Sequence, residues 1–363
     1  MFAMKVKQLD RAPRNGRALG LALLLGALVL ALLVQMLAGS FFAGLYALVS
    51  TVRAGHPIHQ MPDAAVTLML VFSQVLSLLI FLPWWRLLRG RDSAHPLMRP
   101  VGSPRRGMVV TVCSLLVLGL AFQVVVSLIL SLVLPLFPHV MHEYDQIMQT
   151  ATGSSAVWLE LLSVCVLAPL SEEIICRGVM LEGALRLVAP SHVYSTAGGG
   201  ASRPVPISSR SFWVANLLQA LAFGVLHFNI TQGLYAFALG LALGWVYWRT
   251  GRLRYAMVLH AAMNASSYVM SLVLGYVPEP FSSLLVMALL VGAAYALVAL
   301  HRGWKPIETV GSPDSVPSAE PALSAPSAPS IESAPPHSAP VMRVSLREGL
   351  PSDPGSSHGS DRA

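Results

Sequence analysis

Long apolar stretches recur along most of this chain, and short polar segments separate them. A helix needs about 20 predominantly apolar residues to cross a bilayer. Eight stretches approach or exceed this length, at about 18–38, 64–83, 108–134, 155–180, 211–228, 232–248, 255–275 and 281–300. The pattern predicts an all-α fold, a polytopic membrane helix bundle with about eight transmembrane helices.

The composition agrees with this prediction. Hydrophobic residues make up 55% of the chain and charged residues only 11%, whereas soluble domains carry roughly a quarter charged residues. The formal net charge of +7 does not indicate nucleic-acid binding, because no basic patch with interleaved aromatic residues is present. The lipid bilayer, and no nucleic acid, is therefore the expected partner of the apolar surface.

Basic residues fall in alternate connecting segments. Arginines are concentrated between the second and third apolar stretches, recur in every second segment after it, and return with Arg302 after the last stretch. The intervening segments are neutral or acidic, as around Glu143 and Asp145. By the positive-inside rule the basic segments are cytoplasmic. This predicts both termini in the cytoplasm and a multi-pass protein of a cell membrane. We expect that membrane to be the bacterial inner membrane.

These boundaries divide the chain into four parts. Residues 1–17 form a basic cytoplasmic N-terminus, 18–150 hold the first three membrane helices with their loops, and 151–304 hold the fourth to eighth. After Lys305 the composition changes to Ser, Pro and Ala with scattered charge, which cannot bury enough apolar surface to offset chain entropy. Residues 305–363 are therefore predicted to be a disordered cytoplasmic tail.

The fourth apolar stretch contains three charged residues, Glu172, Glu173 and Arg177. On a helix Glu173 and Arg177 share a face, with the acid N-terminal, which is the favourable order for an ion pair. Glu172 points about 100° away from Glu173, so one carboxylate is neutralised and one is available. The alternative is a charge cluster at the cytoplasmic surface, but apolar residues follow, and Arg186 is the first expected surface arginine.

Two further polar groups lie in apolar surroundings. His227 ends an apolar run, and Phe223 lies one helical turn before it, where it can pack against the imidazole. His260 and Asn264 share a helical face, which suits two donors aimed at one oxygen. Singly, such a His is more often a hydrogen-bonded core residue, and such an Asn often bonds a neighbouring helix. Together the groups predict a water-activating site, because ionisable residues inside membrane segments mark function.

Counting about 1.5 Å of rise per residue tests whether these groups can meet. Glu172 is about 21 Å from Arg186, and His227 is as far from the start of its own helix, so these two reach one level. His260 is only about 9 Å from Arg254, which leaves it about 12 Å too low. The count therefore predicts that a tilted helix or a dipping loop is needed to bring His260 to the other two.

The motifs EExxxR, FxxxH and HxxxN, in this order on successive predicted membrane helices, resemble the CPBP family. That family comprises the CAAX prenyl endopeptidases and the bacteriocin-processing or self-immunity proteins. The resemblance covers about 155–275, and all three motifs match without substitution. It implies that 151–304 form the catalytic membrane core of an intramembrane endopeptidase. Glu172 and His227 would activate water, and His260 and Asn264 would stabilise the oxyanion. The supporting residues would be Glu173, Arg177 and Phe223.

The same resemblance implies a membrane-associated protein or peptide as the substrate, and leaves open whether it is prenylated. No cofactor is favoured, because the chain lacks HExxH. The alternative is zinc held by Glu172, His227 and His260, which are zinc ligand types. Two other functions stay open: a catalytically idle membrane binding or immunity protein, and a proton-coupled transporter. No duplicated motif relates the two halves of the chain, which disfavours the transporter.

Two remaining patterns predict packing rather than chemistry. Cys113, Cys165 and Cys176 all lie in apolar stretches and have no CxxC spacing, so we expect packing residues instead of a disulfide or a zinc site. The Gly240-x-x-x-Gly244 spacing allows two helix backbones to approach closely. We expect that contact inside the bundle.

Overall fold

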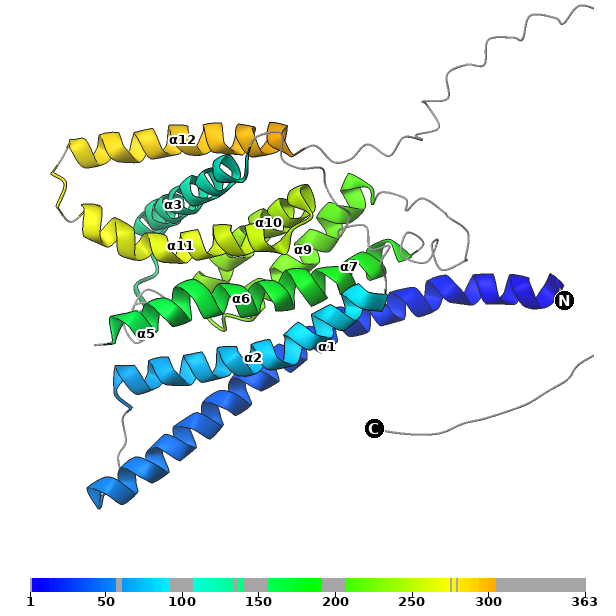
Figure 1. Cartoon of the computed structure of the whole chain (residues 1–363), viewed down its shortest axis with the longest axis horizontal. Helices are drawn as coiled ribbons and strands as arrows, with labels where there is room; N and C mark the ends of the chain where they lie inside the picture. Colours follow the sequence, from blue (N-terminus) through cyan, green and yellow to red (C-terminus); the bar gives the residue numbers. More distant parts are fainter. Residues whose placement is uncertain are drawn as a thin grey trace, which may run out of the picture. The chain divides into compact units, whose positions relative to one another are not determined.

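The structure is a computed structural model that describes residues 2–56, 61–91, 107–133, 136–139, 156–190, 207–274, 276–278 and 280–304. Within these residues every regular element is a helix (Figure 1). In chain order the elements are α1 (Phe2–Ala54), α2 (Asp63–Arg91), α3 (Met108–Val133), α5 (Val157–Leu161), the π-helix η3 (Leu162–Leu167), α6 (Ala168–Glu173), the π-helix η4 (Ile174–Met180), α7 (Leu181–Val188), α9 (Ser209–Val225), α10 (Ile230–Thr250), α11 (Leu253–Leu274) and α12 (Phe281–Gly303).

Each of the eight predicted stretches contains helix, which confirms the all-α membrane fold. Five helices are long and apolar enough to cross a membrane by their own length and composition; they are Gly16–Ala54, Asp63–Leu88, Met108–Val133, Ile230–Thr250 and Phe281–Gly303. The polar motifs lie on the other helices, where charged and amide side chains lower the hydropathy, and α9 has only 17 residues. The fourth helix continues past the predicted end near 180, through α7.

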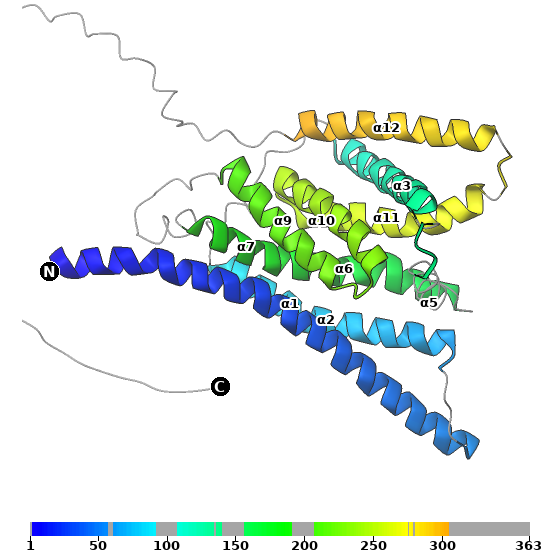
Figure 2. The same ribbon diagram turned by 180° about the vertical axis from the view of Figure 1, so that it is seen from behind.

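The fourth helix is the centre of the bundle. Figures 1 and 2 show α1 and α2 along one side of it and α3 and α12 on the other side. Helices α9, α10 and α11 lie between the fourth helix and the pair α3 and α12. It is a continuous rod of α5, η3, α6, η4 and α7. Contacts join this rod to α1, α2, α9 and α11. Residues 173–186 of this helix are buried on every face, and a helix in such a position is apolar nearly all round apart from its paired charges. The first half of the helix exposes Val157, Trp158 and Val166, so its apolar residues also form an outer face.

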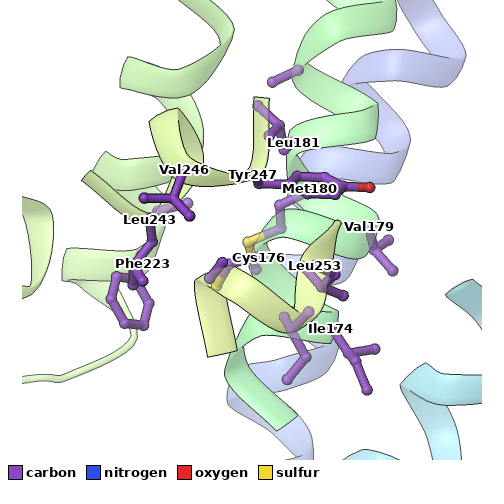
Figure 3. Packing of buried hydrophobic residues seen from close by; sticks show 14 of the residues in the cluster. Ile174, Cys176, Val179, Met180, Leu181, Phe223, Leu243, Val246, Tyr247 and Leu253 are labelled. Carbon is purple, nitrogen blue, oxygen red and sulfur yellow. The ribbon is translucent and has the colours of Figure 1, made fainter. Parts of the chain in front are cut away.

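Figure 3 shows how η4 packs into this core. Ile174, Cys176 and Val179 are buried together with Leu243 of α10 and other apolar side chains. Cys176 is fully buried, as the packing prediction requires. The prediction is wrong for Cys113, which is exposed on α3, because that side of α3 faces away from the bundle.

The two glycines of α10 allow it to approach α9 closely. A Cβ atom at Gly240 would lie 3.0 Å from the Cβ atom of Ala220, and one at Gly244 would overlap the side chain of Asn216. The expected contact inside the bundle is confirmed. It brings the backbone carbonyl of Gly240 within reach of polar side chains from neighbouring helices.

A second close crossing joins α1 to α7. A Cβ atom at Gly183 would lie 2.6 Å from the backbone nitrogen of Leu24 and 2.8 Å from the carbonyl oxygen of Gly20. Backbone atoms cannot move aside as a flexible side chain can. The crossing therefore requires glycine on α7, and it ties the N-terminal helix to the helix that carries the charged motif.

We expect Gly183→Ala to lower the stability of the folded protein by about 1–3 kcal/mol, because overpacking forces the two backbones apart. Thermal unfolding in detergent measures this change. Gly26→Ala is the matched control, since a Cβ atom at Gly26 meets nothing within 4 Å. Equal melting temperatures for the two variants would contradict a backbone contact between α1 and α7.

Several predictions concern residues outside the described part of the chain. These are the disordered tail predicted for 305–363 and the side chains of the basic segment before residue 16. The assignment of the termini to the cytoplasm stays a prediction. The backbone of the N-terminal segment is helical from Phe2, so α1 begins well before the predicted apolar stretch.

Candidate active site

One cavity of about 320 Å³ gathers all four residues that the sequence predicted to be catalytic. Its walls come from α2, α3, η3, α6, α9, α10, α11 and the turn after α9. The polar and aromatic residues that line it are Gln123, Glu172, Phe223, His227, Gln232, Tyr235, His260, Asn264, Ser267 and Tyr268. Apolar side chains, among them Leu70 of α2 and Val126 of α3, complete the wall. Helices without any motif thus help to enclose the site.

The two glutamates of α6 lie in different environments, as their helical spacing predicts. Glu173 is fully buried, and its Oε1 accepts a hydrogen bond of 2.8 Å from Nη1 of Arg177. Glu172 lines the cavity, and about a quarter of its side chain is exposed (24%). The predicted ion pair is present, and Glu172 is the carboxylate that can reach a substrate or a water molecule.

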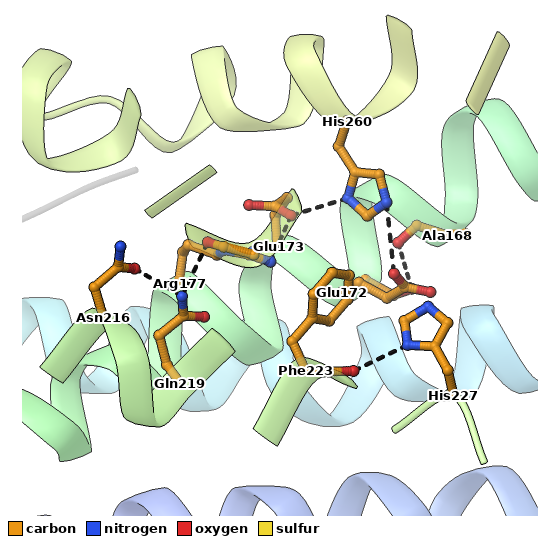
Figure 4. A network of polar contacts seen from close by, with 11 residues as sticks. Ala168, Glu172, Glu173, Arg177, Asn216, Gln219, Phe223, His227 and His260 are labelled. Atoms are coloured by element: carbon orange, nitrogen blue, oxygen red, sulfur yellow. Dashed lines mark hydrogen bonds and ion pairs between the residues drawn. The ribbon is translucent and has the colours of Figure 1, made fainter. Parts of the chain in front are cut away.

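His260 connects the two glutamates (Figure 4). Its Nδ1 lies 2.9 Å from Oε1 of Glu173, and its Nε2 lies 3.7 Å from Oε2 of Glu172. A carboxylate oxygen only accepts hydrogen bonds, and Oε1 of Glu173 accepts from Arg177 as well. Nδ1 of His260 therefore carries a proton, and Nε2 is the ring atom that faces the cavity.

The predicted depth mismatch of His260 is wrong. It assumed that Arg254 and Arg186 both mark the cytoplasmic surface. Arg186 is instead buried, with its Nε 2.5 Å from Oε1 of Glu182. Arg254 itself is exposed, although its neighbour Tyr255 is only 2% exposed. With Arg186 buried, the count has no common surface level, and His260 lies within 3.7 Å of Glu172.

A layer of buried polar groups holds Arg177 behind the cavity. Its Nη2 donates to the carbonyl oxygen of Gly240 over 3.1 Å, and its guanidinium lies 4.6 Å from the ring centre of Phe223. Gln219 also donates to the Gly240 carbonyl and to Oδ1 of Asn216 (Figure 4). The sequence analysis missed this layer, although two amides in the apolar run of α9 were a visible signal.

His227 occupies the turn between α9 and α10. Its Nδ1 lies 2.9 Å from the carbonyl oxygen of Phe223, which can only accept, so the neutral ring has its proton on Nδ1 and a lone pair on Nε2. The ring of Phe223 packs edge-on against both imidazoles, with centroid distances of 4.9 Å to His227 and 5.8 Å to His260. In Figure 4 the carboxylate of Glu172 lies between the two imidazoles.

The residue after His227 is in a costly conformation. Phe228 has a φ of 52°, the only positive φ outside glycine in the described residues. A bulky residue in this region is a genuine outlier, and such strain persists where the surrounding structure requires it. At this residue the chain turns from α9 into α10. His227 therefore reaches the cavity from the turn after α9 and not from the side of a helix.

Asn264 is tied to the central rod. Its Nδ2 donates to the carbonyl oxygen of Val164 over 2.8 Å. In η3 the N–H of Ala168 donates to the carbonyl of Ser163, five residues earlier, so the same spacing would pair Val164 with Pro169. Proline has no N–H. The amide of Asn264 therefore satisfies a carbonyl that the π-helix leaves open.

A buried carboxylate that no motif contains lies at the start of the rod. Glu160 of α5 is only 1% exposed, and its Oε1 accepts a hydrogen bond of 2.5 Å from the hydroxyl of Tyr268. Tyr268 lies on α11 one turn after Asn264 and lines the cavity. Glu160 thereby holds a wall of the cavity in place. The signal for it was a lone acid in an apolar stretch, which the motif analysis passed over.

We expect Tyr268→Phe to lower stability by about 1–3 kcal/mol, because it leaves a buried acceptor without its donor. Tyr276→Phe removes the same hydroxyl from a residue that is 83% exposed, and it should leave the melting temperature unchanged. Thermal unfolding in one detergent compares the two variants. A melting temperature for Tyr268→Phe within error of the control would mean that the hydrogen bond contributes nothing.

No group of three His, Cys, Asp or Glu side chains among the described residues is placed to hold a metal ion. The zinc alternative would need Glu172, His227 and His260 on one ion at about 2.0–2.2 Å. Oε2 of Glu172 and Nε2 of His260 lie 3.7 Å apart, and Nδ1 of His260 lies 2.9 Å from Glu173. Metal-bound histidines also make such a carboxylate contact, so the contacts of His260 suit both arrangements.

Comparison with known proteins bears on the same segment. The model of a family described as type II CAAX prenyl endopeptidase Rce1-like matches residues 154–266. The chain carries an Rce1-like domain. All three motifs lie inside the matched residues, as the resemblance to the CPBP family predicts. Neither the comparison with curated proteins nor the comparison with solved structures gives a match.

The Rce1-like domain does not enclose the cavity alone. Gln123 of α3 and Tyr268 of α11 line it and lie outside the matched residues 154–266. With its apolar helices, the chain is a multi-pass membrane protein.

Proposed function

We propose that this protein is an intramembrane endopeptidase that hydrolyses a peptide bond of a membrane-associated or lipidated protein or peptide, as in CAAX-type processing. The Rce1-like domain supports a protease of this general kind. The observation that carries the proposal is the convergence of Glu172, His227, His260 and Asn264 on one cavity. These residues come from three separate motifs up to 92 positions apart in the chain (264 − 172).

In this proposal Glu172 and His227 activate the attacking water. A carboxylate and a neutral imidazole that accepts through Nε2 can share the proton that water loses. The proton then passes to the nitrogen of the leaving amine when the peptide bond breaks. The carboxyl product keeps the oxygen of the water, so that atoms and charge balance without a cofactor.

His260 and Asn264 stabilise the oxyanion. Oxyanion donors typically contribute about a hundred- to thousandfold in rate. For His260 this requires the ring to be protonated on Nε2 as well. With a protonated His260, its charge and that of Arg177 balance the two charges of Glu172 and Glu173. The cluster is then formally neutral, which lowers the cost of burying it.

The substrate enters from the membrane. Many outward-facing side chains of α2, α3 and α10 are apolar, so a lipidated peptide can approach these helices within the bilayer. Whether its lipid is a prenyl group is part of the test. We place the Rce1-like core at 151–304, with 18–150 as additional wall, in the inner membrane of a bacterium.

Terminal-peptide proteomics on membranes tests the function. Membranes that contain the wild-type protein should show new protein termini that are missing with Glu172→Ala at equal protein levels. Termini that depend on Glu172 would also name the substrate and show whether it carries a prenylated cysteine. Identical termini in both samples would favour the catalytically idle binding or immunity protein instead.

Metal dependence separates the two catalytic arrangements. We expect purified protein to keep its activity after exhaustive chelation, because Glu172 and His227 can activate water without a metal ion. Activity and zinc content are measured on the same sample before and after chelation. Activity that is lost to a chelator and restored by added zinc would assign Glu172, His227 and His260 as metal ligands.

A further inference from the structure

A second hollow lies on the outer surface of the bundle, between α9, α10 and α12. It has a volume of about 770 Å³, more than twice that of the catalytic cavity. Its lining residues are Trp213, Leu241, Ala242, Trp245, Leu297, Val298, His301 and Arg302. None of them lines the catalytic cavity. The groove is therefore a separate site.

The length of the groove is apolar and one end is basic. Trp213, Leu297 and Val298 are each more than two-fifths exposed, so the wall is open to the membrane. His301 and Arg302 belong to the last turn of α12. The described lining contains no acidic side chain. An apolar slot with a cationic end is complementary to a molecule that has a long apolar tail and an anionic head.

Two more arginines lie at the start of α9 and at the end of α10. Arg210 is exposed in the first turn of α9, one turn before Trp213. Arg249 lies in the last turn of α10, and its Nη2 donates to the carbonyl oxygen of His301 over 2.7 Å. That bond holds the ends of α10 and α12 together. The Nε of Arg249 is buried without a hydrogen-bond partner among the described residues.

The simpler interpretation assigns these residues to the membrane boundary in general. Tryptophans are enriched at bilayer interfaces, and arginines follow apolar segments on the cytoplasmic side. That interpretation accounts for each residue alone. It does not account for a groove between three helices whose apolar walls all lead to one basic end, and basic pockets between transmembrane helices bind anionic lipid head groups.

We propose that this groove binds one phospholipid with an anionic head group. The head group lies at His301 and Arg302, with Arg210 beside it, and one acyl chain follows the wall formed by Leu297 and Trp245. The site is independent of the proposed protease chemistry. It fastens α12, which packs chiefly on α3, to the α9–α10 pair that supports Arg177.

Native mass spectrometry of the purified full-length protein in detergent tests the proposal, with phosphatidylglycerol and phosphatidylcholine as probes. We expect phosphatidylglycerol to bind at least tenfold more tightly than phosphatidylcholine. Arg302→Gln should weaken phosphatidylglycerol about fivefold, since one arginine near a membrane surface contributes about that factor. Leu297→Trp keeps every charge but fills the groove, and it should weaken binding at least tenfold.

Arg254→Gln is the matched control. Arg254 is an exposed arginine that lies outside the groove, where it stacks on Tyr255. It should leave the affinity unchanged. Equal binding of the two lipids, equal loss in Arg254→Gln and Arg302→Gln, or full binding by Leu297→Trp would each overturn the proposal. Melting curves of all variants without added lipid confirm that they are folded.

Discussion

Glu172→Gln is expected to lower kcat/KM by about a hundredfold to ten-thousandfold, the usual contribution of a positioned general base. The substitution keeps the size of the side chain and removes only its ability to take a proton. Glu172 is partly exposed and its partner is His260 at 3.7 Å, so the fold should survive. His227→Ala should produce a loss of similar size, because both residues act on one water molecule.

The measurement uses purified protein and a peptide that carries the cleavage site found in membranes. Asp63→Asn is the matched control, since it makes the same chemical change on an exposed residue of α2. Its activity should equal that of the wild type. If Glu172→Gln turns over substrate as fast as Asp63→Asn, Glu172 is not the general base. His260 or a bound metal would then have to activate the water.

Arg177→Ala is expected to have the largest effect on folding. Arg177 is 1% exposed and contacts Glu173, the carbonyl of Gly240 and the ring of Phe223. Without it the carboxylate of Glu173 is left in low dielectric with His260 as its remaining partner. Breaking a buried ion pair by removing one partner costs about 3–5 kcal/mol, a large part of the stability of an ordinary domain.

Folded yield after purification and the melting temperature in detergent both report this loss. Arg254→Ala removes an exposed arginine and should leave both unchanged. Arg177→Lys restores the charge but not the planar fork, so it should recover only part of the yield. Wild-type yield and melting of Arg177→Ala would show that the contacts of Arg177 contribute nothing to folding.

Much of the fold could be predicted because it is encoded locally. The apolar stretches match helices because a bilayer demands both length and continuous backbone hydrogen bonding. The ends of the helices were less predictable. The fourth helix runs on through α7, and Arg186 is buried beside Glu182, because a charge on a helix can be neutralised one turn away without reaching the surface.

The sequence alone determined which residues lie on the same face of one helix. The spacing of Glu173 and Arg177, and that of His260 and Asn264, follows from the helical repeat, and no other part of the fold can change it. Only the tertiary structure decided what these faces meet. His260 lies between two carboxylates, Asn264 satisfies a carbonyl beside Pro169, and Glu160 holds Tyr268. These contacts depend on the relative heights and tilts of helices far apart in the chain. Those heights are set by the packing of whole faces, such as the glycine contacts of α7 and α10, and no count along a single helix contains them.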